Sequence, residues 1–255
     1  MILVFKKKTV AIVSAIIAIS IIGIAILIGI FNVEHSKATS KLIPIYYVKS
    51  DSKKVALTFD ASWGADKTRD IMNLLDKNGS KSTFFLTGYW VETYPELVKE
   101  IHQRGHLLGN HSANHLHMTT TSPLDMSDEL TSVSKKIHSI TGYRTEYFRA
   151  PFGEYNDDLI KCAESNNMKV IQWNVDTLDW KGTTASEIVN IVESKTIDGS
   201  IILCHNDSEN ILDALPLILV ALKNKGLSLV TLDELIIKSD YIIDHDGRQI
   251  SNLNK

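Results

Sequence analysis

HLLGNHSANH, residues 106–115, joins a short apolar stretch directly to two histidines that stand four residues apart. The apolar part predicts a strand, and His111 and His115 follow at its carboxyl end. Imidazole is the commonest metal ligand among protein side chains, and this spacing recurs in zinc sites. The alternative is that both histidines are surface or capping residues of a polar loop. Other segments of the chain favour the metal site.

Strand patterns and helix patterns alternate along the rest of the chain. Apolar stretches predict strands at 55–60, 82–86, 106–110, 147–149, 168–176, 200–205 and 227–230. Apolar residues at helical spacing predict helices at 67–77, 95–104, 125–140, 156–166, 185–196, 211–225 and 232–237. This alternation is typical of a parallel α/β fold, in which functional residues collect at the carboxyl ends of the strands.

The composition indicates one globular domain. Of 255 residues, 44% are hydrophobic and 22% charged, and about 200 residues outside the two ends suffice for one core. Lys6–Lys8 are the only basic residues before Asn32, so the rest of the chain has 24 basic against 30 acidic side chains. A mildly acidic body argues against a nucleic-acid partner. Cys162 and Cys204 are too few for a disulfide framework, and we expect two buried free thiols.

The N-terminal segment predicts a membrane anchor. Thr9–Phe31 is a run of 23 uncharged residues, which as a helix would span about 34 Å against a hydrocarbon core of about 30 Å. Because Lys6–Lys8 precede the run, the N-terminus should stay in the cytoplasm and the remainder should lie outside the cell membrane. A cleaved signal peptide, with a cleavage site at Ser36-Lys37-Ala38, is the alternative. The run is longer than the roughly 7–15 residues of a signal h-region, which favours the uncleaved anchor.

These features divide the chain into four parts. We expect a cytoplasmic lysine stub and transmembrane anchor at 1–31, an extracytoplasmic linker at 32–52, an α/β domain at 53–238 and a loose tail at 239–255. The linker contains a short apolar patch, 42–48, that could add an edge strand. Pro44 argues against a central strand there, since proline cannot donate a ladder hydrogen bond.

Polar side chains stand at five predicted strand ends. They are Asp60, His111, Arg149, Asp176 with Asp179, and His205. Each has a structural alternative when taken alone, as a helix cap, a surface charge, a turn residue or a satisfied core histidine. Together they supply a carboxylate base, imidazole metal ligands, an arginine, and a carboxylate beside a histidine acid. That set suits metal-assisted hydrolysis of an amide or ester.

The polar segments resemble the five ordered motifs of the polysaccharide deacetylases, the NodB-homology enzymes of carbohydrate esterase family 4. The segments are Thr58-Phe59-Asp60, His111-Ser112-Ala113-Asn114-His115, Arg149-Ala150-Pro151-Phe152-Gly153, Asp176-Thr177-Leu178-Asp179-Trp180 and Leu203-Cys204-His205. The resemblance covers about Val55 to Leu235. It implies a distorted (β/α) barrel as the fold.

The resemblance also implies a catalytic base and a metal. Asp60 would take a proton from the attacking water, and Arg149 would hydrogen-bond and orient Asp60, a task that suits the guanidinium group. His111 and His115 would bind a divalent metal, which in this family is usually zinc, cobalt or nickel.

The other motif residues would complete the site. The resemblance implies that Asp179 raises the basicity of His205, which would protonate the leaving amine. The backbone N–H of Phe152 would help to bind the oxyanion. Trp180 and Leu203 would wall the pocket for the acetyl methyl group.

The first motif departs from the family pattern. The family usually has a second aspartate after Asp60, as a metal ligand, and this chain has Ala61. Asp60 itself, Asp66, a water or the substrate could take the place of this third metal ligand. Because two neutral imidazoles lack an anionic third ligand, we expect weak metal binding. The motif-3 tyrosine is Phe152 here. The sequence from Thr58 to Gly64, with the N-terminal anchor, looks most like the sporulation-associated PdaB-type branch.

Two functions follow from the sequence. The first is hydrolysis of N-acetyl groups on peptidoglycan-type cell-wall glycan, in the setting of sporulation. The second is non-enzymatic binding of wall glycan by a degenerate member of the family, which the alanine at position 61 favours. The intact acid and base residues favour the enzyme, because a pure binding protein needs neither.

Overall fold

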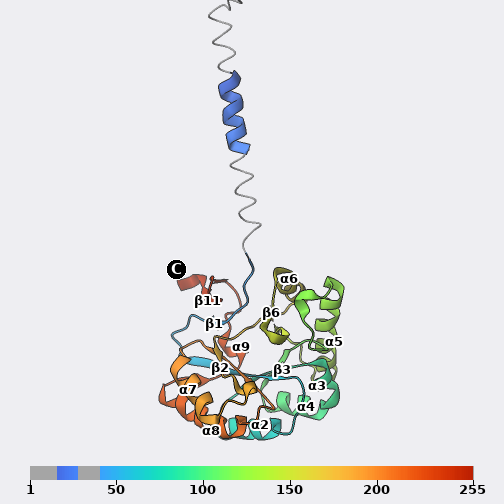
Figure 1. Ribbon diagram of the computed structural model, residues 1–255, viewed down its shortest axis with the longest axis vertical. Helices are drawn as coiled ribbons and strands as arrows, with labels where there is room; N and C mark the ends of the chain where they lie inside the picture. The colour runs from blue at the N-terminus through green and yellow to red at the C-terminus, as the bar shows by residue number, and fades with distance from the viewer. Residues whose placement is uncertain (1–15, 28–40, 255) are drawn as a thin grey trace, which may run out of the picture. The chain divides into compact units, whose positions relative to one another are not determined.

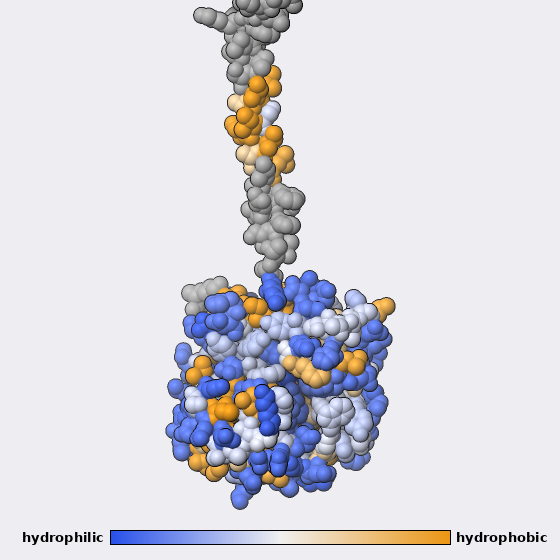
Figure 2. Space-filling view, viewed as in Figure 1, coloured by the Kyte–Doolittle hydropathy of each residue, from blue (hydrophilic) through white to orange (hydrophobic). Residues whose placement is uncertain are grey.

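The computed structural model describes residues 16–27 and 41–254. Two units separate by their internal contacts, Met1–Lys41 and Leu42–Lys255. In the first unit, residues 16–27 are helical, and their surface is largely hydrophobic, whereas the visible face of the second unit is mostly hydrophilic (Figure 2). Within the described ranges, no helix has both the length and the apolar character needed to cross a membrane. The two ends of the predicted anchor, 9–15 and 28–31, lie outside the described residues.

The second unit is built on a parallel sheet. Its strands are β2 (Lys54–Ala61), β3 (Thr83–Leu86), β4 (Leu107–Asn110), β5 (Tyr147–Phe148), β6 (Lys169–Val170), β7 (Val175–Asp176), β8 (Ile201–His205) and β9 (Ser228–Leu229). The order is β6-β5-β4-β3-β2-β8-β7, and β9 pairs with the start of β2. Neighbouring strands run parallel. The parallel α/β fold predicted from the alternation of elements is therefore confirmed.

The stretch 168–176, predicted as one strand, forms two short strands on opposite edges of this sheet. The connection from Val170 to Val175 spans at most about 18 Å, so the two edges must approach each other and the sheet curls into a distorted barrel. Residues 45–47 pair with both sides of this gap, Tyr47 with Ser200 just before β8 and Ile45 with Ile171 just after β6. The Ile45 N–H donates to Val170 O at 3.0 Å, and the Ile45 carbonyl accepts from Gln172 N at 2.8 Å. Part of the predicted linker thus closes the barrel.

The predicted loose tail is wrong for residues 241–251. β1 (Tyr47–Val48), β11 (Arg248–Ser251) and β10 (Tyr241–Ile243) form a second, three-stranded sheet in that order. Gly247 permits the turn between β10 and β11, because its φ is +75° and a Cβ there would lie 2.2 Å from the Tyr46 ring. Both ends of the chain after Leu42 therefore belong to the domain, which begins earlier than the predicted boundary at residue 53.

Helices surround the sheet (Figure 1). They are α2 (Thr68–Lys77), α3 (Gly88–Thr93), α4 (Pro95–Gln103), α5 (Pro123–Thr141), α6 (Asp157–Ser165), α7 (Ala185–Lys195), α8 (Ile211–Asn224) and α9 (Leu232–Leu235), with 3-10 turns at Met118–Thr120, Pro151–Gly153, Asp179–Lys181 and Asn252–Asn254. The ends of α5 are set by local residues: the Ser122 side chain caps its first turn, and Gly142, at φ +76°, ends it. Of the eight, α3 was not predicted, since it is short and begins with glycine.

Strand β2 packs against two different cores. Leu57, Phe59 and Ala61 belong to the cluster that lies between the sheet and its outer helices. Ala56 belongs to a second cluster that fills the barrel interior. Because side chains alternate along a strand, Asp60 faces the interior side and Ala61 faces the helix side.

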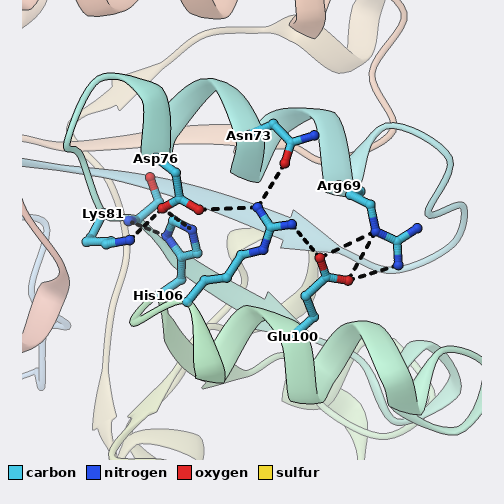
Figure 3. Close-up of polar contacts among 8 residues, drawn as sticks. Arg69, Asn73, Asp76, Lys81, Glu100 and His106 are labelled. Carbon is cyan, nitrogen blue, oxygen red and sulfur yellow. Dashed lines mark hydrogen bonds and ion pairs between the residues drawn. The ribbon is translucent and has the colours of Figure 1, made fainter.

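An ion-pair network joins α2 to α4 (Figure 3). Asp76 of α2 contacts Lys81 at 2.5 Å and Arg104 at 3.2 Å. Arg104 also contacts Glu100 of α4 at 2.5 Å, and Arg69 of α2 contacts the same carboxylate at 2.8 Å. Each partly exposed pair contributes little, but shared partners favour one docking of the two helices.

Candidate active site

Asp60 and Arg149 form a buried pair at the carboxyl end of the sheet. Arg149 Nη1 donates to Asp60 Oδ1 at 2.7 Å and to Thr58 Oγ1 at 2.8 Å, and Nη2 donates to the Gln172 carbonyl at 3.2 Å. The guanidinium lies 4.2 Å from the centre of the Phe85 ring and is fully buried. These contacts fix Arg149, and Arg149 in turn fixes one oxygen of Asp60.

This pairing decides the charge of Asp60. Burial alone would raise the pKa of Asp60, but the charge of Arg149, with smaller contributions from His111 and His205, outweighs it and holds that pKa below its ordinary value. Asp60 is therefore a carboxylate near neutral pH. A fixed, ionised carboxylate in a nearly closed site can accept a proton from water.

His111 and His115 lie together beside Asp60. His111 Nδ1 lies 2.8 Å from the Arg149 carbonyl oxygen, so the proton sits on Nδ1 and donates to it. The lone pair of Nε2 is then free, 3.6 Å from Asp60 Oδ2. The two imidazole centres are 5.0 Å apart. Burial lowers the pKa of both rings, that of His115 to about 4, so both are neutral, the state in which imidazole binds a metal.

The loop that carries the histidines is tightly held. Ser112 and His115 both have positive φ angles, 66° and 54°. The Asn110 side chain accepts from Ser112 N at 2.9 Å, and Ser112 Oγ accepts from His115 N at 3.1 Å. Asn114 N donates to the buried Glu129 of α5 at 2.8 Å. This backbone conformation costs free energy, and these bonds offset the cost and orient the imidazoles.

His205 and Asp179 form a second pair. His205 Nδ1 lies 2.8 Å from Asp179 Oδ1, and Asp179 Oδ2 accepts the His205 backbone N–H at 2.8 Å. Burial lowers the pKa of His205, but the hydrogen bond to Asp179 and the charges of Asp60, Asp179 and Asp176 outweigh burial and raise it above the ordinary value. Asp176, also at a strand end, acts as a turn residue here, since its Oδ1 accepts the Leu178 N–H at 2.9 Å.

The remaining predicted site residues differ in exposure. Leu203 is 3% exposed and lies outside the three apolar clusters of the domain. It shares a strand face with His205, because the two are two residues apart on β8. Trp180 and Phe152 are exposed, and the Phe152 ring stacks on His117 with centres 4.1 Å apart. The structure therefore places the apolar side chain of Leu203 and the imidazole of His205 on the same face of β8.

Similarity to known proteins identifies the family of this chain. Residues 47–171 match the family described as polysaccharide deacetylase. A peptidoglycan-N-acetylglucosamine deacetylase of Bacillus cereus is 35% identical over 70% of this chain and 66% of its own length. A second Bacillus cereus protein of that name is 32% identical over 74% of this chain and 91% of its own length. The chain belongs to the polysaccharide deacetylase family. That family comprises hydrolases that act on amide bonds, and the fold confirms the α/β barrel that the motifs imply.

A solved structure adds a contrast among polysaccharide deacetylase relatives. A carbohydrate esterase 4 pseudoenzyme from Bacillus anthracis superposes on this chain with a TM-score of 0.74, 30% identity, and coverage of 81% of this chain and 72% of that one. A mutant of that pseudoenzyme, described as having restored enzymatic activity, gives a TM-score of 0.73 at 34% identity, covering 75% of this chain and 70% of that one.

The candidate metal ligands of this family member fit a divalent ion in kind but fall short in number. His111 and His115 offer neutral nitrogens, and Asp60 adds a negative charge 3.6 Å from His111 Nε2. Among residues 16–27 and 41–254, three His, Cys, Asp or Glu ligand atoms converge within 4.8 Å only in the exposed turn 244–246. Asp66 is exposed and belongs to no such group.

Ala61 explains the shortfall. Its side chain has no exposed surface and packs with Phe59 in the helix-side cluster. A metal-binding side chain at position 61 would have to point away from this apolar cluster and toward His111 and His115.

Two residues that support this candidate site were not predicted from the sequence. Thr58, which hydrogen-bonds to Arg149, lies two residues before Asp60 on the same strand face. The two-residue alternation of a strand could therefore have predicted its place beside Asp60. Glu129 lies on the buried face of α5 with Leu130 and Val133. An acidic residue inside an apolar helical stripe is a readable signal for a buried polar contact.

Proposed function

We propose that this chain hydrolyses N-acetyl groups on a peptidoglycan-type cell-wall glycan. One observation carries the proposal: Asp60 and His205 are register partners on the neighbouring strands β2 and β8. Asp60 is held by Arg149 and His205 is held by Asp179. A base and an acid side by side at one barrel end are what amide hydrolysis needs, one to activate water and one to protonate the leaving amine.

Each residue then has a defined task. Asp60 accepts a proton from the attacking water, and Arg149 keeps Asp60 ionised and aimed. His205, pinned through Nδ1 to Asp179 at 2.8 Å, donates a proton from Nε2 to the amine nitrogen as the carbon–nitrogen bond breaks. Acetate and the free amino sugar are the products.

His111 and His115 would hold the divalent metal, zinc, cobalt or nickel, with Asp60 as its negative neighbour. When bound, such an ion polarises the acetyl carbonyl and lowers the pKa of water. Because an anionic ligand at position 61 is missing, we propose that the ion binds weakly. We also propose that Leu203 and Trp180 receive the acetyl methyl and that the Phe152 N–H contributes to the oxyanion site.

The test is acetate release from purified N-acetylated peptidoglycan by the full chain supplied with cobalt or zinc. We expect release by the wild type and a loss of at least about 10²-fold in Asp60→Asn, the lower end of what a general base supplies. Equal rates in both would contradict the assignment of Asp60.

A second candidate function is glycan binding without turnover. Ala61 favours it, as does the similarity to a Bacillus anthracis pseudoenzyme of the same family. Wall glycan that co-sediments with the protein but releases no acetate would support this alternative.

We further propose that Thr9–Phe31 anchors the domain outside the cell membrane. The support is the 23-residue uncharged run and the preceding Lys6–Lys8 in the sequence. Protease added to intact protoplasts should degrade the domain. Full protection, or a mature N-terminus near Ala38, would count against an uncleaved anchor.

We also propose a role in sporulation, within the PdaB-type branch. The support is the segment from Thr58 to Gly64 together with the apolar N-terminal run. Spores of a deletion strain should retain more N-acetyl groups in their wall glycan, whereas unchanged spore glycan would contradict this setting.

A further inference from the structure

Exposed aromatic side chains gather at the active-site edge. In the described part of the chain, the aromatic residues among the exposed large hydrophobics are Trp63, Tyr89, Phe152 and Trp180, with 51–58% of their surface accessible. They follow β2, β3, β5 and β7, so each lies at a carboxyl strand end. The other aromatic residues within the described ranges are buried or half-buried. Apolar surface that stays exposed beside a site marks ligand contact.

Four ring-to-ring contacts join five side chains at this edge into a continuous row. The ring centre of Tyr89 lies 5.7 Å from that of Trp63, which lies 6.1 Å from His115. His115 lies 4.7 Å from Phe152, and Phe152 stacks on His117 at 4.1 Å. We call these five residues the aromatic ledge. His115 belongs both to the ledge and to the histidine pair, so a chain lying along the ledge passes over the site.

The ledge is built at a cost to the backbone. Phe152 has φ +60° and His115 has φ +54°, both in the left-handed region that disfavours such side chains. The exposed Phe152 ring gains little from burial in return. Strained residues that persist beside a site point to a functional constraint.

We propose that the aromatic ledge binds the sugars that flank the reacting one in a linear N-acetylated glycan. This inference rests on the proposed function for its substrate class. The faces of a pyranose ring carry C–H groups and stack on aromatic rings, while its hydroxyl groups stay in water. Among the ledge side chains only His117 pairs with an acidic side chain of the described residues, Glu154 at 3.0 Å, so the ledge suits an uncharged chain better than a polyanion.

The experiment measures the affinity of the full chain for N-acetylglucosamine oligomers of increasing length, by calorimetry. For the wild type we expect affinity to rise with length. In Trp63→Ala and Tyr89→Ala, affinity for the longest oligomer should fall by about 2- to 12-fold each, the worth of one aromatic contact of about 0.5–1.5 kcal/mol. The effect on the single sugar should be much smaller, so the gain with length shrinks.

Two controls accompany these variants. Trp63→Phe keeps an aromatic face and should retain most of the gain with length. Leu217→Ala removes an equally exposed apolar side chain, 50% accessible, from α8, and should leave the oligomer affinities unchanged.

The outcomes separate this inference from the proposed function. Wild-type affinity that does not rise with length, or the same rise in Trp63→Ala, would overturn the ledge even if acetate is released. A length-dependent affinity that the ledge variants lose would uphold it even if no acetate is released.

Discussion

Asp179 holds His205 at two points: its Oδ1 lies 2.8 Å from the ring Nδ1, and its Oδ2 accepts the backbone N–H at 2.8 Å. The Asp179 side chain has no exposed surface, whereas that of His205 is 27% exposed. The imidazole is therefore fixed through one nitrogen, and the other is left for proton transfer. This arrangement leads to the first two predictions.

Asp179→Asn and His205→Ala should each reduce kcat by about 10²- to 10⁴-fold, the usual worth of general acid–base catalysis. The double variant should be little worse than His205→Ala, because the two residues act as a unit. Acetate release under saturating glycan is the measurement. Asp176→Asn is the matched control, since that carboxylate holds only the Leu178 N–H in a turn. Additive losses would show that Asp179 acts independently of His205.

The pH profile should report the raised pKa of His205. An acid must be protonated to act, so kcat/KM should fall as pH rises through that pKa. Asp179→Asn weakens the hydrogen bond that raises this pKa and removes one of the three charges that raise it, while burial, which lowers it, remains. The alkaline limb of the profile should then move to lower pH, with a much smaller shift in Asp176→Asn. An alkaline limb that stays in place in Asp179→Asn would assign it to another group.

Arg149→Met should destabilise the fold as well as the chemistry. The Asp60 carboxylate is only 6% exposed, and breaking a buried pair by removing one partner costs about 3–5 kcal/mol. Denaturant unfolding of Arg149→Met and of Asp60→Asn with Arg149→Met measures this cost. The second variant should recover part of the lost unfolding free energy, because it leaves no unpaired charge. Equal losses in the two would attribute the cost to packing of the guanidinium on Phe85.

Ala61→Asp should tighten zinc or cobalt binding by about 10- to 100-fold, roughly 1.4–2.8 kcal/mol, because it adds an anionic ligand. Without metal the variant should unfold at a lower temperature than wild type, since position 61 is buried beside Phe59. Metal should then raise its unfolding temperature by more than that of wild type.

Ala61→Asn controls for size without charge in calorimetric metal titrations. Equal affinities of wild type and Ala61→Asp would mean that another group already fills the third place. No binding to either would mean that His111 and His115 do not form a metal site.

The sequence predicted the polar strand ends because they follow from pattern. Asp60 ends an apolar strand and His205 ends another, and parallel strands bring their carboxyl ends to one edge. Pairwise contacts agree with the motif resemblance: Arg149 lies on Asp60 and Asp179 on His205. These strand-end positions could be predicted from the pattern of apolar residues and the order of the strands along the chain.

The remainder depended on contacts that a local pattern does not contain. Residues 168–176 alternate as one strand would, and only barrel closure splits them between two edges. Residues 241–251 look like a polar tail in the sequence, but Arg248 and Gln249 pair with Tyr47 and Val48, which lie far away along the chain. Phe152 stacks on His117 and has a positive φ, which favours glycine, so no residue propensity predicts this conformation.

The most direct test of the central claim is to run the reaction in heavy-oxygen water with the full chain in excess over N-acetylated glycan. Excess protein reveals even a slow turnover, and mass spectrometry of the acetate reports the origin of its oxygen. Water activated by Asp60 predicts acetate that carries one heavy oxygen, formed by wild type and lost in Asp60→Asn. Glycan that binds but yields no acetate, or acetate without the heavy oxygen, would contradict hydrolysis at this site.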